Sequence, residues 1–321
     1  MVKLLLPLLS LSLLLAACTT PAPPTPVKTV ASVSVVGAST LKIGGPASLT
    51  ATAKDSGGNA LSGQTFTWTS SAPNVVSVDA GGTLTVKRLS ATPVILSATD
   101  GDKVGTLSVT TYGLELTMGT FNSAPGSSDP KIGTAALVKF RAPGSATAIN
   151  GSNAVQLSGP ADVSDLKLQI GPVTGAQDYD WDASIQAAPV SGSYSAAVTV
   201  DGVNYTSSDT LNAASLLGGF QNGSFQLTGS TGYTLSGSFA SGTTFFQPVL
   251  LDKVNSDAEP IFFDFKPIVS LPKSYSFSPA IPVSTYTPLI ESFNQDYSSF
   301  AALTPEEFNL SVTVLPATSV N

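Results

Sequence analysis

The sequence predicts an all-β protein made of tandem β-sandwich domains. Short segments that alternate small or polar residues with apolar ones recur at intervals of about 8–12 residues, which is typical of sandwiches. Charged residues make up only 11% of the chain, and the abundance of Gly, Ser, Thr and Val favours strands and turns over helical bundles. The 321 residues are enough for two or three domains.

The N-terminal residues have the pattern of an export signal. Lys3 precedes a leucine-rich run from Leu4 to Leu15, which is shorter than the about 20 residues that a membrane-spanning helix needs. A basic start, a short apolar run and small residues at its end are typical of a cleaved signal peptide. We therefore expect residues 1–17 to be removed.

The end of this signal, Leu15-Ala16-Ala17-Cys18, resembles the lipobox of bacterial lipoproteins. The resemblance implies that the sulfur of Cys18 receives a diacylglyceryl group before cleavage. Cys18 is the only cysteine, so an intramolecular disulfide and a thiolate zinc site are both excluded. Two or more acyl chains anchor a protein stably, because each buried methylene contributes about 0.8 kcal/mol. We predict lipid attachment at Cys18.

Residues 18–28 form a proline-rich linker behind the anchor. Proline favours extended polyproline II, so this linker is expected to hold the first folded unit away from the membrane. Thr19 stands where lipoproteins retained at the inner membrane of many Gram-negative bacteria carry aspartate. The lipoprotein resemblance therefore implies an exported, membrane-anchored protein at the outer membrane or cell surface.

Composition excludes several classes of function. The net charge is −7, with only 14 Lys and Arg residues, which argues against a nucleic-acid partner because phosphate binding needs clustered cations. The chain has no histidine. Ser-His-Asp and Cys-His catalysis and histidine zinc sites are therefore excluded. We expect no enzymatic activity and no cofactor, apart from the calcium candidate described below.

The first domain is expected to cover residues 29–112. Turn clusters such as Lys54–Asn59 and Asp79–Gly82 separate short runs with a period of two, which marks half-buried strands. About seven strands are expected, over residues 31–36, 48–53, 65–70, 75–78, 83–86, 94–99 and 105–110.

Three pieces of this domain resemble the bacterial Ig-like group 2 domain of intimins and other surface proteins. They are Leu61–Ser71 (LSGQTFTWTSS), Pro73–Val78 (PNVVSV) and Gly82–Val86 (GTLTV). The resemblance implies a rigid spacer or adhesive module without enzymatic activity. Where the family approaches its sixth strand with Gly-Thr-Ala, this chain has Ser90-Ala91-Thr92-Pro93. Trp68 is expected to be the core aromatic residue of the sandwich rather than a ligand-stacking one.

Two further sandwiches are expected, an Ig-like one over residues 113–216 and a fibronectin type III-like one over residues 217–321. Asp201-Gly202 between two strand patterns is a hairpin signal. Near the C-terminus, Thr304-Pro305-Glu306-Glu307 combines a threonine N-cap, proline at the first helical position and glutamate at the third. We expect a helical turn there.

Asp178, Asp180 and Asp182 are a weak candidate for a calcium site, because carboxylate oxygens are hard ligands that Ca²⁺ prefers. The alternative is a strand in which Tyr179 and Trp181 face the core and the aspartates face water. The three aspartates lack the glycine and the distal glutamate of an EF-hand.

Other motifs are weaker. Ser270-x-x-Lys273 matches a penicillin-binding-protein motif that needs a helix, but Pro272 opposes a helix and the companion motifs are missing. Glu307 is better explained by helix capping than by acid–base chemistry. The Phe262, Phe263 and Phe265 run is expected to be strand core, with an exposed binding strip as the alternative.

These observations predict a non-enzymatic, membrane-anchored surface lipoprotein that acts as a spacer, adhesion or envelope-assembly module. The alternative is a lipoprotein whose C-terminal sandwich binds a carbohydrate or envelope ligand through exposed aromatic residues. The expected partners are the membrane, through the lipid, and a protein or polysaccharide ligand at the cell surface. A hydrolase that uses carboxylates alone is disfavoured.

Overall fold

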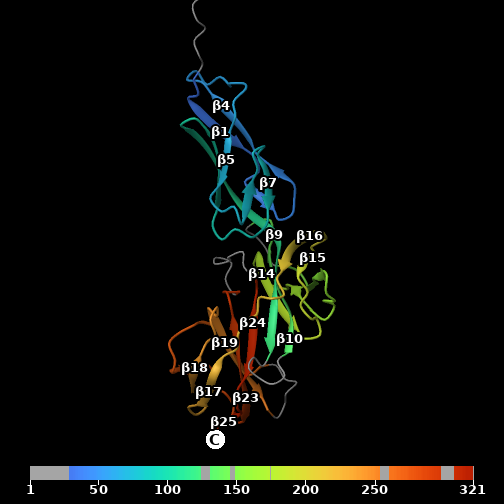
Figure 1. The fold of residues 1–321 in the computed structure, drawn as a ribbon, viewed down its shortest axis with the longest axis vertical. Helices are drawn as coiled ribbons and strands as arrows, with labels where there is room; N and C mark the ends of the chain where they lie inside the picture. The colour runs from blue at the N-terminus through green and yellow to red at the C-terminus, as the bar shows by residue number, and fades with distance from the viewer. Residues whose placement is uncertain are drawn as a thin grey trace, which may run out of the picture.

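The structure, a computed structural model, describes residues 29–123, 131–144, 149–173, 175–253, 260–297 and 307–320. It contains 25 β-strands, and no helix occurs in these ranges. The molecule is elongated, with the first domain at one end and the C-terminal strands at the other (Figure 1). The prediction of an all-β fold with tandem β-sandwiches is confirmed.

The first domain is a sandwich of short strands that ends in one long strand. Trp68 packs against a core that includes Leu41, Val76, Leu96 and Val109, as expected of a core aromatic residue. Its strands are β1 (Ser32–Val36), β2 (Thr40–Lys42), β3 (Ala47–Ser48), β4 (Thr50–Lys54), β5 (Thr67–Ser70), β6 (Val76–Val78), β7 (Thr83–Val86), β8 (Val94–Asp100) and β9 (Lys103–Ser123).

Strand β9 is 21 residues long and runs from the first domain into the next without a break (Figure 1). Its first part pairs with β8, Thr110–Tyr112 pairs in parallel with β2, and Gly113–Ser123 pairs with β10. Gly113 has a φ of 114°, a conformation that residues with a Cβ rarely adopt. Glycine therefore allows the strand to change partners at this point.

Beyond the junction, one large sheet extends through both expected C-terminal domains. Its path is β14-β10-β9-β24-β23-β19-β20. The strands are β10 (Lys131–Arg141), β14 (Gln177–Ser184), β19 (Phe245–Asp252), β20 (Phe262–Phe263), β21 (Lys266–Pro267), β23 (Thr285–Phe293), β24 (Leu310–Val314) and β25 (Thr318–Ser319). The predicted boundary between residues 216 and 217 thus lies between segments that share this sheet.

Two three-stranded sheets pack against the large sheet and complete two sandwiches. Sheet β12-β15-β16 packs on β9 and β10, and sheet β17-β18-β22 packs on β19 and β23. Their strands are β12 (Gln156–Ser158), β15 (Gly192–Val200), β16 (Val203–Leu211), β17 (Gln221–Leu227), β18 (Gly232–Ser238) and β22 (Lys273–Ser276), and a separate pair is β11 (Asn153–Ala154) with β13 (Gln169–Ile170).

The large sheet is strongly curled. Trp181 on β14 and Phe293 on β23 are separated by three strands in the sheet order, yet their ring centroids lie 5.7 Å apart. Leu137, Phe308 and Leu310 belong to the same cluster, so the concave face of the sheet forms a core of its own. Trp181 therefore faces a core, as the strand alternative for this segment predicts, whereas Tyr179, which that alternative also places in the core, is 36% exposed.

Local expectations differ in accuracy. Asp201 and Gly202 have φ angles of 48° and 78°, as a two-residue hairpin turn requires. Strand β23 is not among the strands predicted from the sequence, and it contains Pro288. Pro288 is tolerated because it lies between the residues that pair with β24, which begin at Leu289, and those that pair with β25, which end at Tyr286.

Candidate functional site

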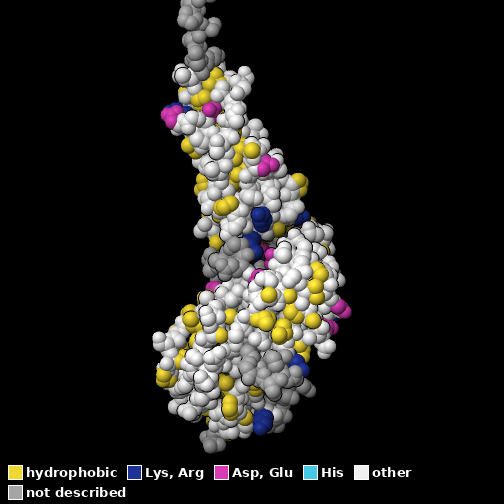
Figure 2. All heavy atoms as spheres, in the orientation of Figure 1, with side chains coloured by type: hydrophobic (Ala, Val, Ile, Leu, Met, Phe, Trp, Pro, Cys, Tyr) yellow, Lys and Arg dark blue, Asp and Glu magenta, His cyan; other side chains and the backbone are white. Residues whose placement is uncertain are grey.

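A buried network of charged groups joins the first domain to the second. Arg88 Nη1 donates to Glu115 Oε1 at 3.1 Å, and Arg88 Nη2 lies 3.8 Å from Asp209 Oδ1. The other carboxylate oxygen of Glu115 accepts from the backbone N–H of Leu89 at 2.6 Å. Burial raises the pKa of Glu115, and the charge of Arg88 opposes that shift. Lys and Arg side chains gather near this junction on an otherwise sparsely charged face (Figure 2).

The Ser90–Pro93 loop, which departs from the family resemblance, takes part in this junction. Ser90 N–H donates to Thr111 Oγ1 at 2.5 Å, and Thr111 N–H donates to Ser90 Oγ at 3.0 Å. Arg141 Nη1, from β10, donates to the carbonyl of Ser90 at 2.7 Å. The sequence reveals only a local turn here, because the partner that makes the loop important lies 51 residues away.

The three aspartates of the calcium candidate bind backbone amides. Asp182, Asp180 and Asp178 accept hydrogen bonds from the N–H groups of Lys167, Gln169 and Gly171 at 2.7, 2.8 and 2.5 Å. These carboxylates hold segment 167–171 against edge strand β14. Among the described residues, no group of three or more His, Cys, Asp or Glu side chains is arranged to hold a metal. A calcium site at these aspartates stays a prediction, and the geometry favours a structural role.

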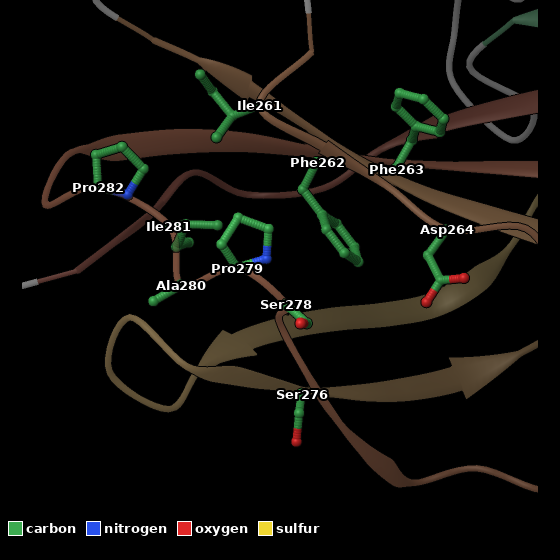
Figure 3. A pocket seen from close by; sticks show the side chains of 10 residues that line it. All are labelled: Ile261, Phe262, Phe263, Asp264, Ser276, Ser278, Pro279, Ala280, Ile281 and Pro282. Carbon is green, nitrogen blue, oxygen red and sulfur yellow. The ribbon is translucent and has the colours of Figure 1, made fainter.

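An open groove of about 550 Å³ lies in the C-terminal sandwich, between β20 and the segment that follows β22 (Figure 3). Phe262 and Asp264 point from one wall toward the other, whereas Phe263 turns away (Figure 3). Phe263 is 63% exposed. The lining residues are Ile261, Phe262, Phe263, Asp264, Ser276, Ser278, Pro279, Ala280, Ile281 and Pro282.

The electrostatics of the groove centre on Asp264. Its carboxylate forms an ion pair with Lys266, whose Nζ also lies 5.2 Å from the ring centroid of Tyr275. The hydroxyls of Tyr233 and Tyr275 are buried and have no hydrogen-bond partner in the described part of the chain. Burial, and then the nearby charge of Asp264, raise the pKa of both tyrosines. Two unsatisfied donors therefore lie close to a groove-lining carboxylate.

The phenylalanine run of the sequence divides between packed and exposed side chains. Phe262 packs on Phe277, with ring centroids 4.8 Å apart, and Phe265 stacks on Phe245 at 5.0 Å. Phe263 alone of the three is strongly exposed. Phe262 on β20 and Phe265, between β20 and β21, thus pack partly buried against the cores, whereas the exposed ring of Phe263 is a single residue.

The remaining predictions from the sequence concern the lipid anchor, the helical turn near the C-terminus and the Ser270-x-x-Lys273 motif. Cys18, with the whole of residues 1–28, lies outside the described residues, and so does most of the expected helical turn at Thr304–Glu307. Lys273 belongs to strand β22, so the Ser270-x-x-Lys273 match is not on the helix that its chemistry needs. The described part of the chain contains no apolar helix of membrane-spanning length.

Two tyrosines whose roles are not predicted from the sequence mark the corners of the C-terminal sandwiches. Tyr194 Oη donates to the carbonyl of Val190 at 2.8 Å, and Tyr286 Oη donates to the carbonyl of Pro282 at 2.6 Å. This four-residue link resembles the tyrosine corner of Ig-like sandwiches. The signal was available: both tyrosines closely follow a Pro-Val-Ser segment at the start of a strand.

No family model matches the chain, and no curated protein matches it. Among solved structures, a fragment of the S-layer protein SbsC is 13% identical, with 86% of this chain and 40% of that chain covered and a TM-score of 0.23. The FN1–FN3 domains of chicken CNTN1 are 8% identical (87% and 98% covered, TM-score 0.23). FdeC, an Escherichia coli adhesin, is 12% identical (87% and 95% covered, TM-score 0.20). At these identities the similarity concerns the fold alone.

Proposed function

We propose that this chain is a non-enzymatic, membrane-anchored surface lipoprotein whose β-sandwiches form a rigid spacer and adhesion or envelope-assembly module. The observation that carries the proposal is strand β9, which runs through the first junction and is held there by the buried pair Arg88–Glu115. A strand shared by two domains resists bending because its backbone hydrogen bonds would have to break. The lipobox resemblance at Cys18 supplies the anchor, and the Ig-like group 2 resemblance of residues 29–112 supports a surface role.

Membrane fractionation tests the anchor. Replacing Cys18 with Ser removes the only acyl acceptor of the proposed lipobox, so the variant should leave the membrane fraction and appear as a soluble or secreted protein. Substitution of Thr19 by Ser is the matched control and should leave fractionation unchanged. Membrane association of the Cys18→Ser protein would contradict the proposed anchor.

A second candidate function is ligand binding by the C-terminal sandwich. The observation that favours it is the groove beside β20, together with the exposed ring of Phe263 on the other side of that strand (Figure 3). Its sandwich lies at the end of the molecule opposite to the first domain (Figure 1), which is the end that a spacer would project outward. Loss of surface adhesion or ligand capture in a Phe263→Ala protein that still fractionates with membranes would support this role.

A further inference from the structure

We propose that edge strand β5 of the first domain binds an extended, uncharged segment of a partner protein, which adds to the sheet as a further strand. This inference rests on the adhesion or assembly role proposed above, and it names the surface and the class of partner for that role. Three observations carry it: the unpaired backbone groups of β5, the lack of charge along this edge, and the contrast with other edges of the molecule.

The backbone of β5 is unpaired on one side. β5 lies at the edge of its sheet and pairs with β8. Ser71 N–H donates to the carbonyl of Ile95 at 2.9 Å, and in an antiparallel pair alternate residues direct their N–H and C=O groups to the same neighbour. The N–H and C=O groups of Trp68 and Ser70 therefore point away from β8. Within the described ranges they have no hydrogen-bond partner.

The edge lacks the features by which natural proteins discourage strand pairing. Charged side chains, proline and bulges are the usual means. The segment Leu61–Pro73 contains no Asp, Glu, Lys or Arg, and its only proline follows β5. The register of β5 with β8 runs without a shift. This edge therefore presents no charge and no bulge that would oppose a neighbouring strand.

Two other edges of the molecule are occupied, which sets β5 apart. The aspartates of β14 bind the amides of segment 167–171. On edge strand β16, the carbonyl of Asn204 accepts a hydrogen bond from Lys42 Nζ at 2.9 Å. In the part of the chain that the structure describes, no side chain covers the outward groups of β5 in this way.

The two faces of β5 indicate the kind of segment that fits beside it. Phe66 and Trp68 pack on one face against a core cluster of the first domain, whereas Thr67 and Thr69 are exposed on the other. Cross-strand neighbours place their side chains on the same face, so a segment that alternates apolar and hydroxyl residues matches both. Segments that add to a sheet edge gain affinity from main-chain hydrogen bonds and specificity from alternate side chains.

Orientation disfavours a second copy of this chain as the occupant. An edge that pairs with itself about a two-fold axis forms an antiparallel pair. β5 shares a sheet with β8 and β9, and β9 follows the long axis of the molecule (Figure 1), so the two molecules would point in opposite directions. Copies anchored through Cys18 in one membrane would instead share a direction.

Calorimetric titration of the full mature chain, kept soluble by Cys18→Ser, tests the proposal with three capped heptapeptides. The first alternates valine and threonine and is N-methylated at every threonine, which leaves one hydrogen-bonding edge and places the valines on the same face as Trp68. The second carries its N-methyl groups on the valines, and the third replaces each valine of the first with glutamate. We expect the first peptide to bind and the other two to bind about tenfold more weakly or less.

Amide hydrogen exchange locates the added strand on the same protein. Without peptide, the amides of Trp68 and Ser70 should exchange faster than those of Thr67 and Thr69, which face β8. At about ten times its Kd, the first peptide should slow exchange at Trp68 and Ser70 by about tenfold, because the bound state protects them.

Proline variants test the edge itself. Ser70→Pro removes an outward N–H without removing a hydrogen bond to β8, which is a position where a sheet tolerates proline. It should weaken binding of the first peptide by about tenfold. The matched control is Ser208→Pro on β16, which also replaces an outward residue, since Ser208 lies four residues after Asn204. That control should leave the affinity unchanged.

The outcomes are distinct. Binding that leaves exchange at Trp68 and Ser70 unchanged, or that survives in a folded Ser70→Pro protein, would overturn the proposal because the peptide then occupies another surface. Equal or tighter binding of the glutamate peptide would overturn the uncharged class, and no binding at millimolar peptide would overturn the site. Slow exchange at both amides that depends on protein concentration alone would assign this edge to a second copy.

The failure of this inference is distinguishable from the failure of the proposed function. Each of these measurements concerns β5, whereas membrane fractionation of the Cys18→Ser variant decides the anchor. The exchange measurement needs no substitution in β5, so it decides the proposal also where Ser70→Pro does not fold.

Discussion

At the scale of single residues, the C-terminal half is notable for polar groups that are buried without a partner. Glu291 on β23 is one of them: its Oε2 is buried and accepts no hydrogen bond from the described residues. Burial alone raises the pKa of Glu291 to about 7. A folded state that binds a proton more tightly than the unfolded state is stabilised by low pH, so this residue ties stability to pH.

The sign of that dependence is a prediction. Between the unfolded pKa of about 4.3 and the folded value, the unfolded chain loses its proton first, so the free energy of unfolding should fall as pH rises. Glu291→Gln should remove this slope and raise stability above pH 7 by up to about 3 kcal/mol. Urea unfolding between pH 4 and 8 measures it.

Asp102→Asn provides the control for Glu291. Asp102 is exposed, and its hydrogen bond with Lys103 lowers the pKa of the carboxyl, a shift opposite in direction to that of Glu291. That variant should keep the slope of the parent protein. An unchanged slope in Glu291→Gln would assign the pH dependence to another group.

At the scale of elements, edge strand β14 is protected by side chains instead of a neighbouring strand. Its alternate aspartates bind alternate amides of segment 167–171. This segment therefore lies along the strand edge, where an open edge would present backbone groups to other chains. The sequence indicated the period of two in this segment, and with it the inward Trp181. It could not indicate which amides the outward carboxylates would meet.

Two variants test this arrangement. Asp180→Ala removes an acceptor from the middle of the row, so it should cost about 1–3 kcal/mol, whereas Asp180→Asn keeps an acceptor oxygen and should cost less. Millimolar calcium should leave the Tm of the parent protein unchanged, because the carboxylates already have partners. A rise in Tm with calcium that disappears in Asp180→Asn would establish the metal site instead.

At the scale of the whole molecule, rigidity depends on the junction. Arg88→Met leaves the carboxylate of Glu115 buried without its cation, so the variant should lose about 3 kcal/mol and scatter X-rays as a broader distribution of shapes. The double variant Arg88→Met, Glu115→Leu removes the unpaired charge and should recover much of the stability. An unchanged scattering profile in Arg88→Met would assign the rigidity to β9 alone.

The continuous sheet makes a separate prediction about domains. Fragments 113–216 and 217–321 should not fold separately, because β24 pairs with β9 and Leu137 shares a core with Phe293. Fragment 113–321 should unfold in one cooperative transition by circular dichroism. Independent, cooperative unfolding of the two shorter fragments would support the boundary between residues 216 and 217.

What the sequence alone determined about this protein is local. The period-two patterns identified most strands of the first domain, the Asp201-Gly202 turn and the core position of Trp68, because each depends on residues within one strand or turn. The composition, which has no histidine and one cysteine, excluded whole classes of chemistry without any knowledge of the fold.

The tertiary structure decided which distant segments meet. A period of two reports that one face of a strand is buried, but it does not name the neighbouring strand. The path of β9 through two domains, the link between Ser90 and Arg141, and the groove between Phe262 and Pro279 all depend on such pairings. The anchor at Cys18 and the ligand site proposed beside Phe263 thus come from different sources: a local motif in the first case, and long-range packing in the second.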